Sequence, residues 1–213
     1  MRPMELNDDQ KVAKLRRKQP VWLNPEPPSP AIYTQKLPTL SGEPLPTIVT
    51  SVPTKQPFRV LFVCWGNICR SPAGQNVFQH LLDENGMSDR INCDSAGTID
   101  AHAGKSPDGR MRDTLEQRGI SVNGAARKIS TGDFRDFDLI LTMDDFNRQE
   151  VLAVAPDAGA RAKVHPFTDF CENHEADEVP DPYYGGSSGF ELVADLIEDG
   201  CQGLLAHIQR QIS

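Results

Sequence analysis

The chain has 213 residues, 38% of them hydrophobic, and a formal net charge of −8 at pH 7. That length suffices for one folded domain but is short for two, and an acidic chain without a basic stripe argues against nucleic-acid binding. The five cysteines are an odd number, and the sequence shows no signal peptide or long apolar run. We therefore expect a protein of the reducing cytoplasm that does not insert into membranes.

The first 57 residues differ in composition from the rest. They hold 11 of the 17 prolines and carry 8 basic and 5 acidic residues, against 14 and 25 in the remainder, so the two parts have net charges of +3 and −11. Residues 5–18 could form a helix that ends in a basic cluster. We expect residues 1–57 to be a Pro-rich, mostly disordered and solvated extension, and residues 58–213 to be the folded domain.

Within the folded domain, strand-like and helix-like segments alternate. The predicted strands are 59–64, 91–96, 138–143 and 162–165, and the predicted helices are 71–85, 108–118, 145–155 and 190–211. This alternation indicates an α/β fold in which helices cover both faces of a parallel sheet. Ligands bind such sheets at the carboxyl ends of the strands.

The most informative motif begins where the first predicted strand ends and reads CWGNICRSP, from Cys64 to Pro72. Ser71 and Pro72 are typical of an N-cap and a first helical position. Gly66 and Asn67 tolerate positive φ, which lets successive N–H groups face one anion, and Arg70 would bind two of its oxygens. The spacing therefore predicts a phosphate-binding loop at a helix start.

Cys64 would lie in the positive field of this loop, which favours a nucleophilic thiolate, and Ser71 could donate its hydroxyl to the sulfur. The neighbouring Cys69 could resolve an oxidised Cys64 as a reversible disulfide, or could be only a small buried side chain. A cysteine six positions before an arginine also arises by chance, so the spacing alone is weak support.

A second motif lies far downstream, in residues 178–186 (EVPDPYYGG). Asp181 stands between two prolines, so its carboxyl group can be presented at a fixed geometry as a proton donor. Tyr183 and Tyr184 could wall a slot for an aromatic ring. The alternative interpretation is an ordinary surface turn with a solvated carboxylate.

Together these motifs resemble the low-molecular-weight protein tyrosine phosphatase family. The resemblance runs from about Phe58 to the C-terminus and includes, in order, the stretches DSAGT (94–98), GKSPD (104–108), ARKI (126–129), DFRDFD (133–138) and LTMDDFN (141–147). It implies a three-layer domain with a four-stranded parallel sheet of order 2-1-3-4. It also implies hydrolysis of phosphotyrosine without a metal or cofactor.

The resemblance implies a role for each matching residue. Cys64 would attack phosphorus and form a phosphocysteine, Arg70 would bind the phosphoryl oxygens, and Asp181 would act as general acid and then as general base. The remaining matches are substrate-binding positions and residues that support the loop: Trp65, Gly66, Asn67, Ile68, Cys69, Ser71, Tyr183 and Tyr184 for the first group, Ser95 and Asp144 for the second.

Three positions bear on specificity and tuning. Gly124 stands where the family usually has a histidine, which predicts the loss of one polar brace. Ala101 replaces an aromatic residue that often stacks on the substrate ring; Trp65 could partly replace that wall, and we expect the following His102 to be an exposed loop residue. Ile68 stands where the phosphoarginine-hydrolysing branch tends to have threonine, and therefore favours phosphotyrosine.

Two other functions remain open at this point. Arsenate reductases share the scaffold but need further redox cysteines, and Cys93, Cys171 and Cys201 form no nearby pair in the sequence. A phosphotyrosine-binding module that has lost turnover is the non-enzymatic alternative. For the phosphatase, we expect a monomer that acts on a tyrosine-phosphorylated protein, which in bacterial members is often an autophosphorylated kinase.

Overall fold

The computed structural model of the chain describes residues 56–183 and 186–212. Four parallel strands form the sheet: β1 (Phe58–Cys64), β2 (Ile91–Gly97), β3 (Leu139–Thr142) and β4 (Val164–Pro166). Their order is β2-β1-β3-β4, which confirms the predicted topology. Because β1 pairs with β2 on one side and β3 on the other, the end of β1 lies in the middle of the sheet edge.

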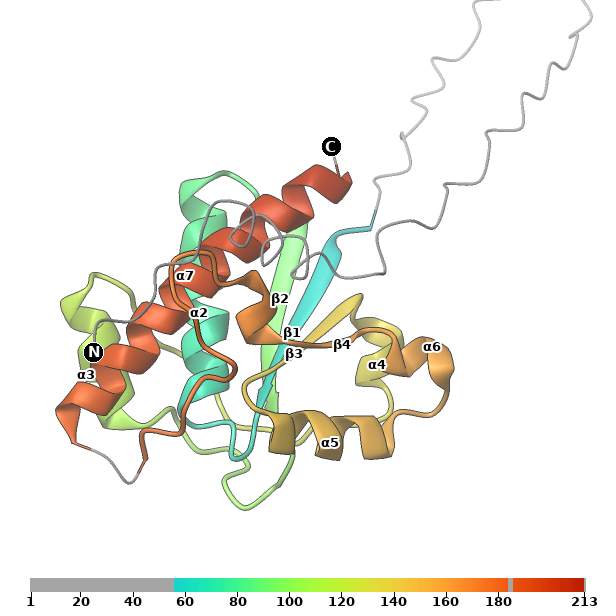
Figure 1. Cartoon of the computed structure of the whole chain (residues 1–213), viewed down its shortest axis with the longest axis horizontal. Coiled ribbons are helices and arrows are strands. Elements are labelled where there is room, and N and C mark those ends of the chain that lie inside the picture. Colours follow the sequence, from blue (N-terminus) through green and yellow to red (C-terminus); the bar gives the residue numbers. More distant parts are fainter. Residues whose placement is uncertain (1–55, 184–185, 213) are drawn as a thin grey trace, which may run out of the picture. The chain divides into compact units, whose positions relative to one another are not determined.

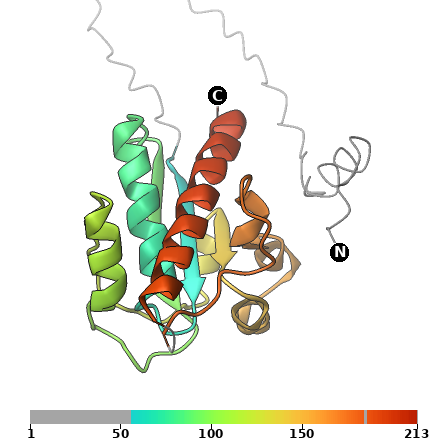
Figure 2. The same cartoon turned by 60° about the vertical axis from the view of Figure 1, so that its left-hand side comes forward.

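Helices cover both faces of this sheet, as Figures 1 and 2 show. One layer contains α2 (Arg70–Glu84), α3 (Gly109–Gln117) and α7 (Ser187–Ile212); α2 packs on β1 and β2, and α7 packs on α2. The other layer contains α4 (Asp133–Asp136), α5 (Asp145–Val154) and α6 (Ala158–Arg161), and a 3₁₀ turn, η1 (Phe167–Phe170), follows β4. No described helix combines the length and apolarity that crossing a bilayer requires.

The alternation of β1 divides the hydrophobic core between the two faces. Leu61 and Val63 join the cluster that includes Val151 of α5. Phe62 points to the opposite face, where its ring lies 5.8 Å from that of Phe78 in α2 and 5.9 Å from that of Phe167. Successive residues of a strand point to opposite faces, so β1 is buried on both sides.

Glycine allows α2 to approach the sheet closely. A Cβ atom at Gly74 would lie 2.7 Å from the ring of Phe62, closer than carbon atoms pack. The helix that carries Arg70 and Ser71 is therefore seated directly on the strand that carries Cys64. This close contact between helix and strand fixes the position of the loop that joins them.

All eight predicted elements are present, with ends that differ by a few residues. Three short elements, α4, α6 and η1, were not predicted, because a single turn has no apolar periodicity to detect. The start of α6 depends on a local cap, since the Asp157 carboxylate accepts a 2.7 Å hydrogen bond from the Ala160 N–H. The predicted extension and its helix at 5–18 lie almost wholly outside the described residues, so the domain division at 57/58 stays a prediction.

Candidate active site

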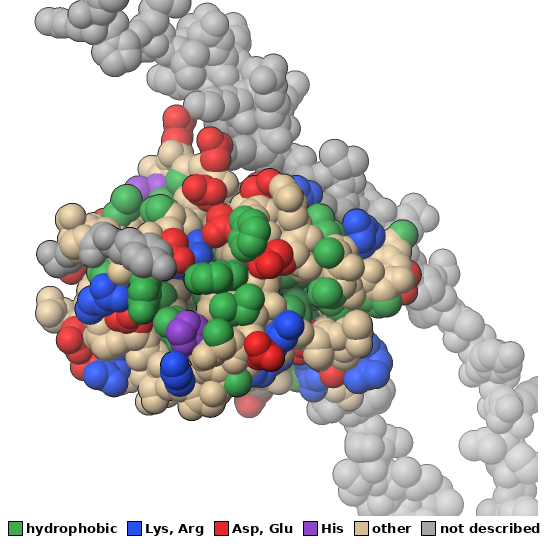
Figure 3. All heavy atoms as spheres, turned by 90° about the horizontal axis from the view of Figure 1, so that it is seen from below, with side chains coloured by type: hydrophobic (Ala, Val, Ile, Leu, Met, Phe, Trp, Pro, Cys, Tyr) green, Lys and Arg blue, Asp and Glu red, His purple; other side chains and the backbone are tan. Residues whose placement is uncertain are grey.

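The site lies at the edge of the sheet where the strands end. Cys64 is the last residue of β1 and pairs with Gly97, the last residue of β2. The N–H of Met143, just after β3, donates to the carbonyl oxygen of Val63. Seen from this end, the molecule presents hydrophobic side chains in the middle of the face with charged side chains around them (Figure 3).

Ser71 does not cap the helix, so that part of the prediction is wrong. The helix α2 begins one residue earlier, at Arg70, and its N-cap Cys69 makes no side-chain capping bond. The hydroxyl of Ser71 instead lies 3.0 Å from the sulfur of Cys64 and 3.2 Å from the carbonyl oxygen of Ala96. No N-cap side chain therefore bonds to the first turn of α2, and binding of an anion there stays a prediction.

Asn67 holds the loop in shape with its buried side chain. Its φ is +53°, the sole positive φ of a non-glycine residue in the described part of the chain. Its Nδ2 donates to the hydroxyls of Ser71 at 3.0 Å and Ser95 at 2.9 Å, and its Oδ1 accepts from the N–H of Arg127 at 2.8 Å. These bonds use the amide's hydrogens and one acceptor position, which fixes the orientation of the side chain.

The network contains a brace that sequence reasoning missed. The hydroxyl of Ser95 donates to the Oε1 atom of Gln75 in α2 at 2.6 Å. A polar partner is therefore present here although Gly124 carries no side chain. A glutamine one turn after the loop gives no signal in the sequence, because only the folded chain brings it to Ser95.

Two glycines let the loop lie against its neighbours. A Cβ atom at Gly97 would come within 2.8 Å of the carbonyl oxygen of Trp65, and one at Gly66 within 2.9 Å of the His102 ring. His102 is half-buried in this position, which corrects the expectation of an exposed loop residue. Trp65 itself is 43% exposed at the rim, where it is accessible to a bound molecule.

Arg70 is buried and faces two carboxylates. Its guanidinium forms an ion pair with Asp144, another with Asp181 at 2.9 Å, and a hydrogen bond to the carbonyl oxygen of Val179 at 3.2 Å. Burial works against its charge, but the Cys64 sulfur and the two carboxylates outweigh this and raise the pKa of the guanidinium. The site therefore keeps a fixed positive charge at the position where a phosphoryl group would be bound.

Asp144 and Asp181 reach Arg70 from different segments. Asp144 also caps α5, since its Oδ1 accepts from the N–H of Asn147 at 2.7 Å. Asp181 lies on the loop after η1, which is anchored to the end of β3 by a 2.7 Å bond from the Val179 N–H to the Met143 carbonyl. Its side chain is 38% exposed, so the carboxyl group faces both the arginine and the opening of the site.

The aromatic slot is described only in part. Tyr183 is 41% exposed, and its N–H donates to the Oδ1 atom of Asp181 at 3.0 Å. Tyr184, the other predicted wall, lies outside the described residues. Ile68 is half-buried in the loop, and its carbonyl oxygen accepts from the N–H of Asp108 at 2.6 Å.

The two cysteines of the loop differ in their chemistry. Burial raises the pKa of the Cys69 thiol well above its usual range, and the charge of Cys64 adds to the effect. Cys69 is therefore a neutral thiol at physiological pH, whereas Cys64 has the Ser71 hydroxyl beside it. Both are free thiols, so a disulfide between them stays a prediction.

The other three cysteines have structural surroundings. The thiols of Cys93, Cys171 and Cys201 contact backbone carbonyl oxygens at 3.5 to 3.6 Å. Burial raises the pKa of Cys93 to about 12 and also raises the pKa of Cys201 well above its usual range. None of these three cysteines takes part in a disulfide bond, which gives no support to the redox pair that an arsenate reductase requires.

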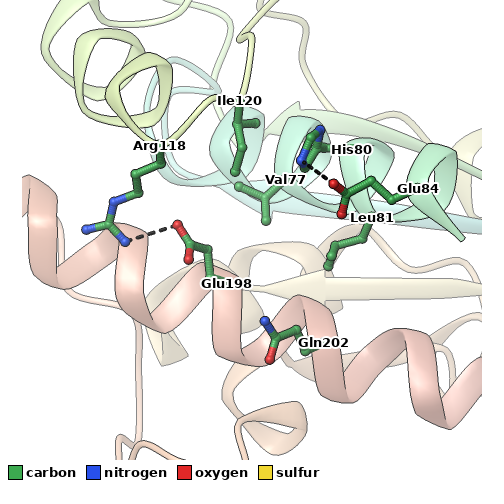
Figure 4. A pocket seen from close by; sticks show the side chains of 8 residues that line it. All are labelled: Val77, His80, Leu81, Glu84, Arg118, Ile120, Glu198 and Gln202. Atoms are coloured by element: carbon green, nitrogen blue, oxygen red, sulfur yellow. Dashed lines mark hydrogen bonds and ion pairs between the residues drawn. The ribbon is translucent and has the colours of Figure 1, made fainter.

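Away from the sheet edge, a hollow with a volume of about 200 Å³ lies between α2, the end of α3 and α7 (Figure 4). Its charged side chains already have partners: Arg118 with Glu198 at 3.0 Å, and His80 with Glu84 at 3.4 Å. None of the predicted site residues lines it. We therefore assign the chemistry to the sheet edge rather than to this hollow.

The sheet-edge site combines a sulfur nucleophile, an anion-binding helix start with a buried guanidinium, and a half-exposed carboxyl group. This arrangement can carry out displacement at a tetrahedral phosphoryl group, with the carboxyl group donating a proton to the leaving oxygen. Among the residues that the structure describes, no histidine, cysteine and carboxylate side chains cluster as metal ligands.

Comparison with known proteins gives consistent results. The family model described as low molecular weight phosphotyrosine protein phosphatase matches residues 59–213. A putative low molecular weight protein-tyrosine-phosphatase of Synechocystis sp. is 47% identical over 154 residues, which are 72% of this chain and 98% of the relative.

Two solved structures agree in fold. A protein tyrosine phosphatase from Entamoeba histolytica, with Hepes in its active site, aligns with a TM-score of 0.70 and 40% identity, over 72% of this chain and 98% of that one. YfkJ from Bacillus subtilis aligns with a TM-score of 0.69 and 38% identity, over 75% of this chain and 99% of that one. With sequence, fold and site geometry in agreement, the chain belongs to the low molecular weight phosphotyrosine protein phosphatase family.

Proposed function

We propose that this protein hydrolyses phosphotyrosine in proteins through a phosphocysteine intermediate, with Cys64 as nucleophile. The observation that carries the proposal is the position of Arg70. Its guanidinium touches Asp181 at 2.9 Å, and the charge of the Cys64 sulfur contributes to its raised pKa. Nucleophile, anion-binding cation and proton donor thus belong to one site.

In the first step, the thiolate of Cys64 attacks phosphorus while the bond from phosphorus to the tyrosine oxygen breaks. Loop N–H groups and Arg70 hold the equatorial phosphoryl oxygens, and this electrostatic stabilisation is the largest catalytic contribution expected here. Asp181, entering the step protonated, gives its proton to the departing oxygen.

In the second step, water replaces the sulfur. Asp181, now a carboxylate, accepts a proton from the water that attacks phosphorus, and the sulfur–phosphorus bond breaks to release inorganic phosphate. The thiolate that leaves is stabilised by the Ser71 hydroxyl, which lies 3.0 Å from it and already accepts a hydrogen bond from Asn67. The single proton of the hydroxyl lies toward the Ala96 carbonyl oxygen at 3.2 Å, and it would turn to the sulfur in the step that needs it.

The rim favours an aromatic ester over a small one. The 43% exposed Trp65, the 41% exposed Tyr183 and the half-buried Ile68 provide apolar surface around a deep nucleophile. A phenyl ring can span this depth, whereas the shorter side chain of phosphoserine cannot. Isoleucine, in place of threonine, also disfavours phosphoarginine.

The test is hydrolysis of three matched peptides that carry phosphotyrosine, phosphoserine or phosphoarginine, with release of phosphate as readout. We expect turnover of the phosphotyrosine peptide alone, and none by Cys64→Ser. A variant Ile68→Thr should gain activity toward phosphoarginine. Preferential hydrolysis of phosphoarginine by the unmodified protein would contradict the assignment of substrate.

The two alternative functions are separated by a rapid-mixing experiment with an aryl phosphate. A burst of phenol followed by a steady rate that depends on Cys64 supports the phosphatase. Absence of any release, together with tight binding of phosphotyrosine, would support a binding module. Reduction of arsenate in the presence of a thiol donor would support a reductase.

We further propose that the protein acts as a cytoplasmic monomer on a phosphoprotein such as an autophosphorylated tyrosine kinase. None of the five cysteines takes part in a disulfide bond, which suits a reducing compartment. Capture of phosphoproteins by Cys64→Ser would identify the substrate, and light scattering would give the oligomeric state. Residues 1–57 are expected to be dispensable for turnover, and a chain beginning at Phe58 that folds but is inactive would contradict this.

A further inference from the structure

Arg110, in the first turn of α3, contacts the loop of Asp181 directly and is linked to the phosphate-binding loop through Asp108. Its guanidinium Nε and Nη2 donate to the two carboxylate oxygens of Asp108 at 3.0 and 2.8 Å, and its Nη1 donates to the carbonyl oxygen of Tyr183 at 3.1 Å. One planar side chain thus joins two segments that lie 73 positions apart in the sequence.

On one side, Arg110 is connected to the phosphate-binding loop. Its partner Asp108 caps α3, accepting from the Arg110 N–H at 2.9 Å, and donates its own N–H to the carbonyl oxygen of Ile68 at 2.6 Å. The same carboxylate therefore orients the guanidinium while the backbone of Asp108 holds the loop. A bidentate pair of this kind restricts rotation of the arginine.

On the other side, Arg110 is connected to the loop of the proton donor. The carbonyl of Tyr183 accepts from the guanidinium, and the N–H of the same residue donates to the Oδ1 atom of Asp181 at 3.0 Å. The guanidinium also lies 5.1 Å from the centroid of the Tyr183 ring and 4.7 Å from that of Phe190, which is buried in α7. These ring contacts fix its plane between the loop and the helix.

The carboxylate of Asp181 therefore has two attachments. Its Oδ2 is held by Arg70, which binds the phosphoryl group, and its Oδ1 is held by the Tyr183 N–H. A bound phosphoryl group competes for the first attachment, because Arg70 then donates hydrogen bonds to the phosphoryl oxygens. The second attachment persists, and its position depends on Arg110.

We propose that Arg110 is a positioning residue that holds Asp181 at the distance from the phosphate-binding loop needed to protonate the leaving oxygen. The inference rests on the proposed function, since it concerns the proton transfer of that reaction. The proposed role involves no contact between Arg110 and the substrate. Its effect should appear only where proton transfer to the leaving group matters.

Leaving groups of different basicity make this effect measurable. Phenolate, with a conjugate-acid pKa of about 10, needs a proton as it departs, whereas dinitrophenolate does not. The ratio kcat/KM includes the step in which the leaving group departs. It should therefore fall about tenfold for phenyl phosphate and less than about threefold for 2,4-dinitrophenyl phosphate in Arg110→Gln, since general acid catalysis is worth about 100-fold or more.

Two companion variants make the experiment specific. Arg110→Lys can still pair with Asp108 but cannot extend a planar fork to the Tyr183 carbonyl, so it should fold normally and lose most of the same effect. Arg112→Gln is the matched control, because Arg112 is on the same helix, is similarly exposed at 44%, and within residues 56–183 and 186–212 forms an ion pair only with Glu116, at 3.7 Å. The control should match the unmodified protein on both substrates.

The decisive comparison is made in an Asp181→Asn background. There Arg110→Gln should cause no further loss with phenyl phosphate, because the group that it positions is gone. Equal losses on the two substrates, or additive losses in the Asp181→Asn background, would overturn the role of Arg110. By contrast, if Asp181→Asn lowered kcat/KM equally for the two substrates, the proposed role of Asp181 as proton donor would be wrong, whatever the result for Arg110.

Discussion

The substitution Asn67→Ala tests whether the phosphate-binding loop is held in shape before substrate arrives. It removes three hydrogen bonds, to Ser71 at 3.0 Å, Ser95 at 2.9 Å and the Arg127 N–H at 2.8 Å. At about 1 kcal/mol each, their loss amounts to about 3 kcal/mol. A residue with a Cβ atom at φ +53° and no compensating bond costs about 1 kcal/mol more.

Three variants at this position separate the two contributions. Asn67→Ala should lower the free energy of unfolding, measured by urea denaturation, by about 4 kcal/mol. Asn67→Gly, which accepts the backbone conformation, should lose about 1 kcal/mol less. Asn67→Asp keeps the acceptor for the Arg127 N–H but places a negative charge beside the sulfur, so it should be the most damaging to catalysis.

The catalytic readout is kcat/KM for phenyl phosphate at a temperature where all variants are folded. A loop whose N–H groups no longer converge should lose about 100-fold, the cost of removing one donor from an oxyanion site. The reasoning would be refuted if Asn67→Ala were as active as the unmodified protein, or if alanine and glycine gave the same stability.

Three further predictions follow from burial, hydrogen bonding and close packing. Asp199→Asn should lower the free energy of unfolding by about 2 kcal/mol at pH 7. Burial opposes the charge of Asp199, but hydrogen bonds from His174 and backbone N–H groups outweigh it and lower the pKa of the carboxyl group. The difference in stability from the unmodified protein should therefore disappear in denaturation curves as the pH falls below about 4. Gly203→Ala would place a Cβ atom on a backbone carbonyl of η1 and should lower stability by about 2 kcal/mol. Gly109→Ala, whose Cβ atom would lie 3.8 Å from the Arg112 guanidinium, should change it by less than about 0.5 kcal/mol. Iodoacetate at neutral pH should alkylate Cys64 and leave Cys69 unlabelled in peptide mass spectra, with inorganic phosphate slowing the reaction; labelling of Cys69 first would contradict its raised pKa.

Sequence patterns were sufficient for the elements with strong local signals. The apolar run of β1 and the proline at position 72 locate a strand and a helix start within two residues of where the structure has them. The order of strands came from the resemblance to a family rather than from periodicity. In the site, Arg70 is brought to Asp181 at 2.9 Å and close enough to Cys64 for the charge of the sulfur to raise its pKa.

What the sequence did not reveal is the pairing between distant side chains. Gln75 reaches Ser95 across 20 positions, and Arg110 reaches the Tyr183 carbonyl across 73. Each residue has an ordinary place on a helix surface, and only the packing of α2 and α3 beside the loops gives it a partner. Of the two roles predicted for Ser71, the contact with the Cys64 sulfur is present and the helix cap is not, because its hydroxyl lies against the sulfur and the helix begins one residue earlier.

The hydrogen bonds around Asn67 have a consequence for how such an enzyme can diversify. Asn67, Ser71 and Ser95 depend on one another for their donors and acceptors, so a change at any one of them leaves the others mismatched. Trp65 and Ile68 enter the loop's hydrogen bonding through their backbone carbonyl oxygens, to Ile99 and Asp108. New substrate preferences can therefore arise at these two rim side chains by single substitutions, while the chemical centre changes only by several simultaneous ones.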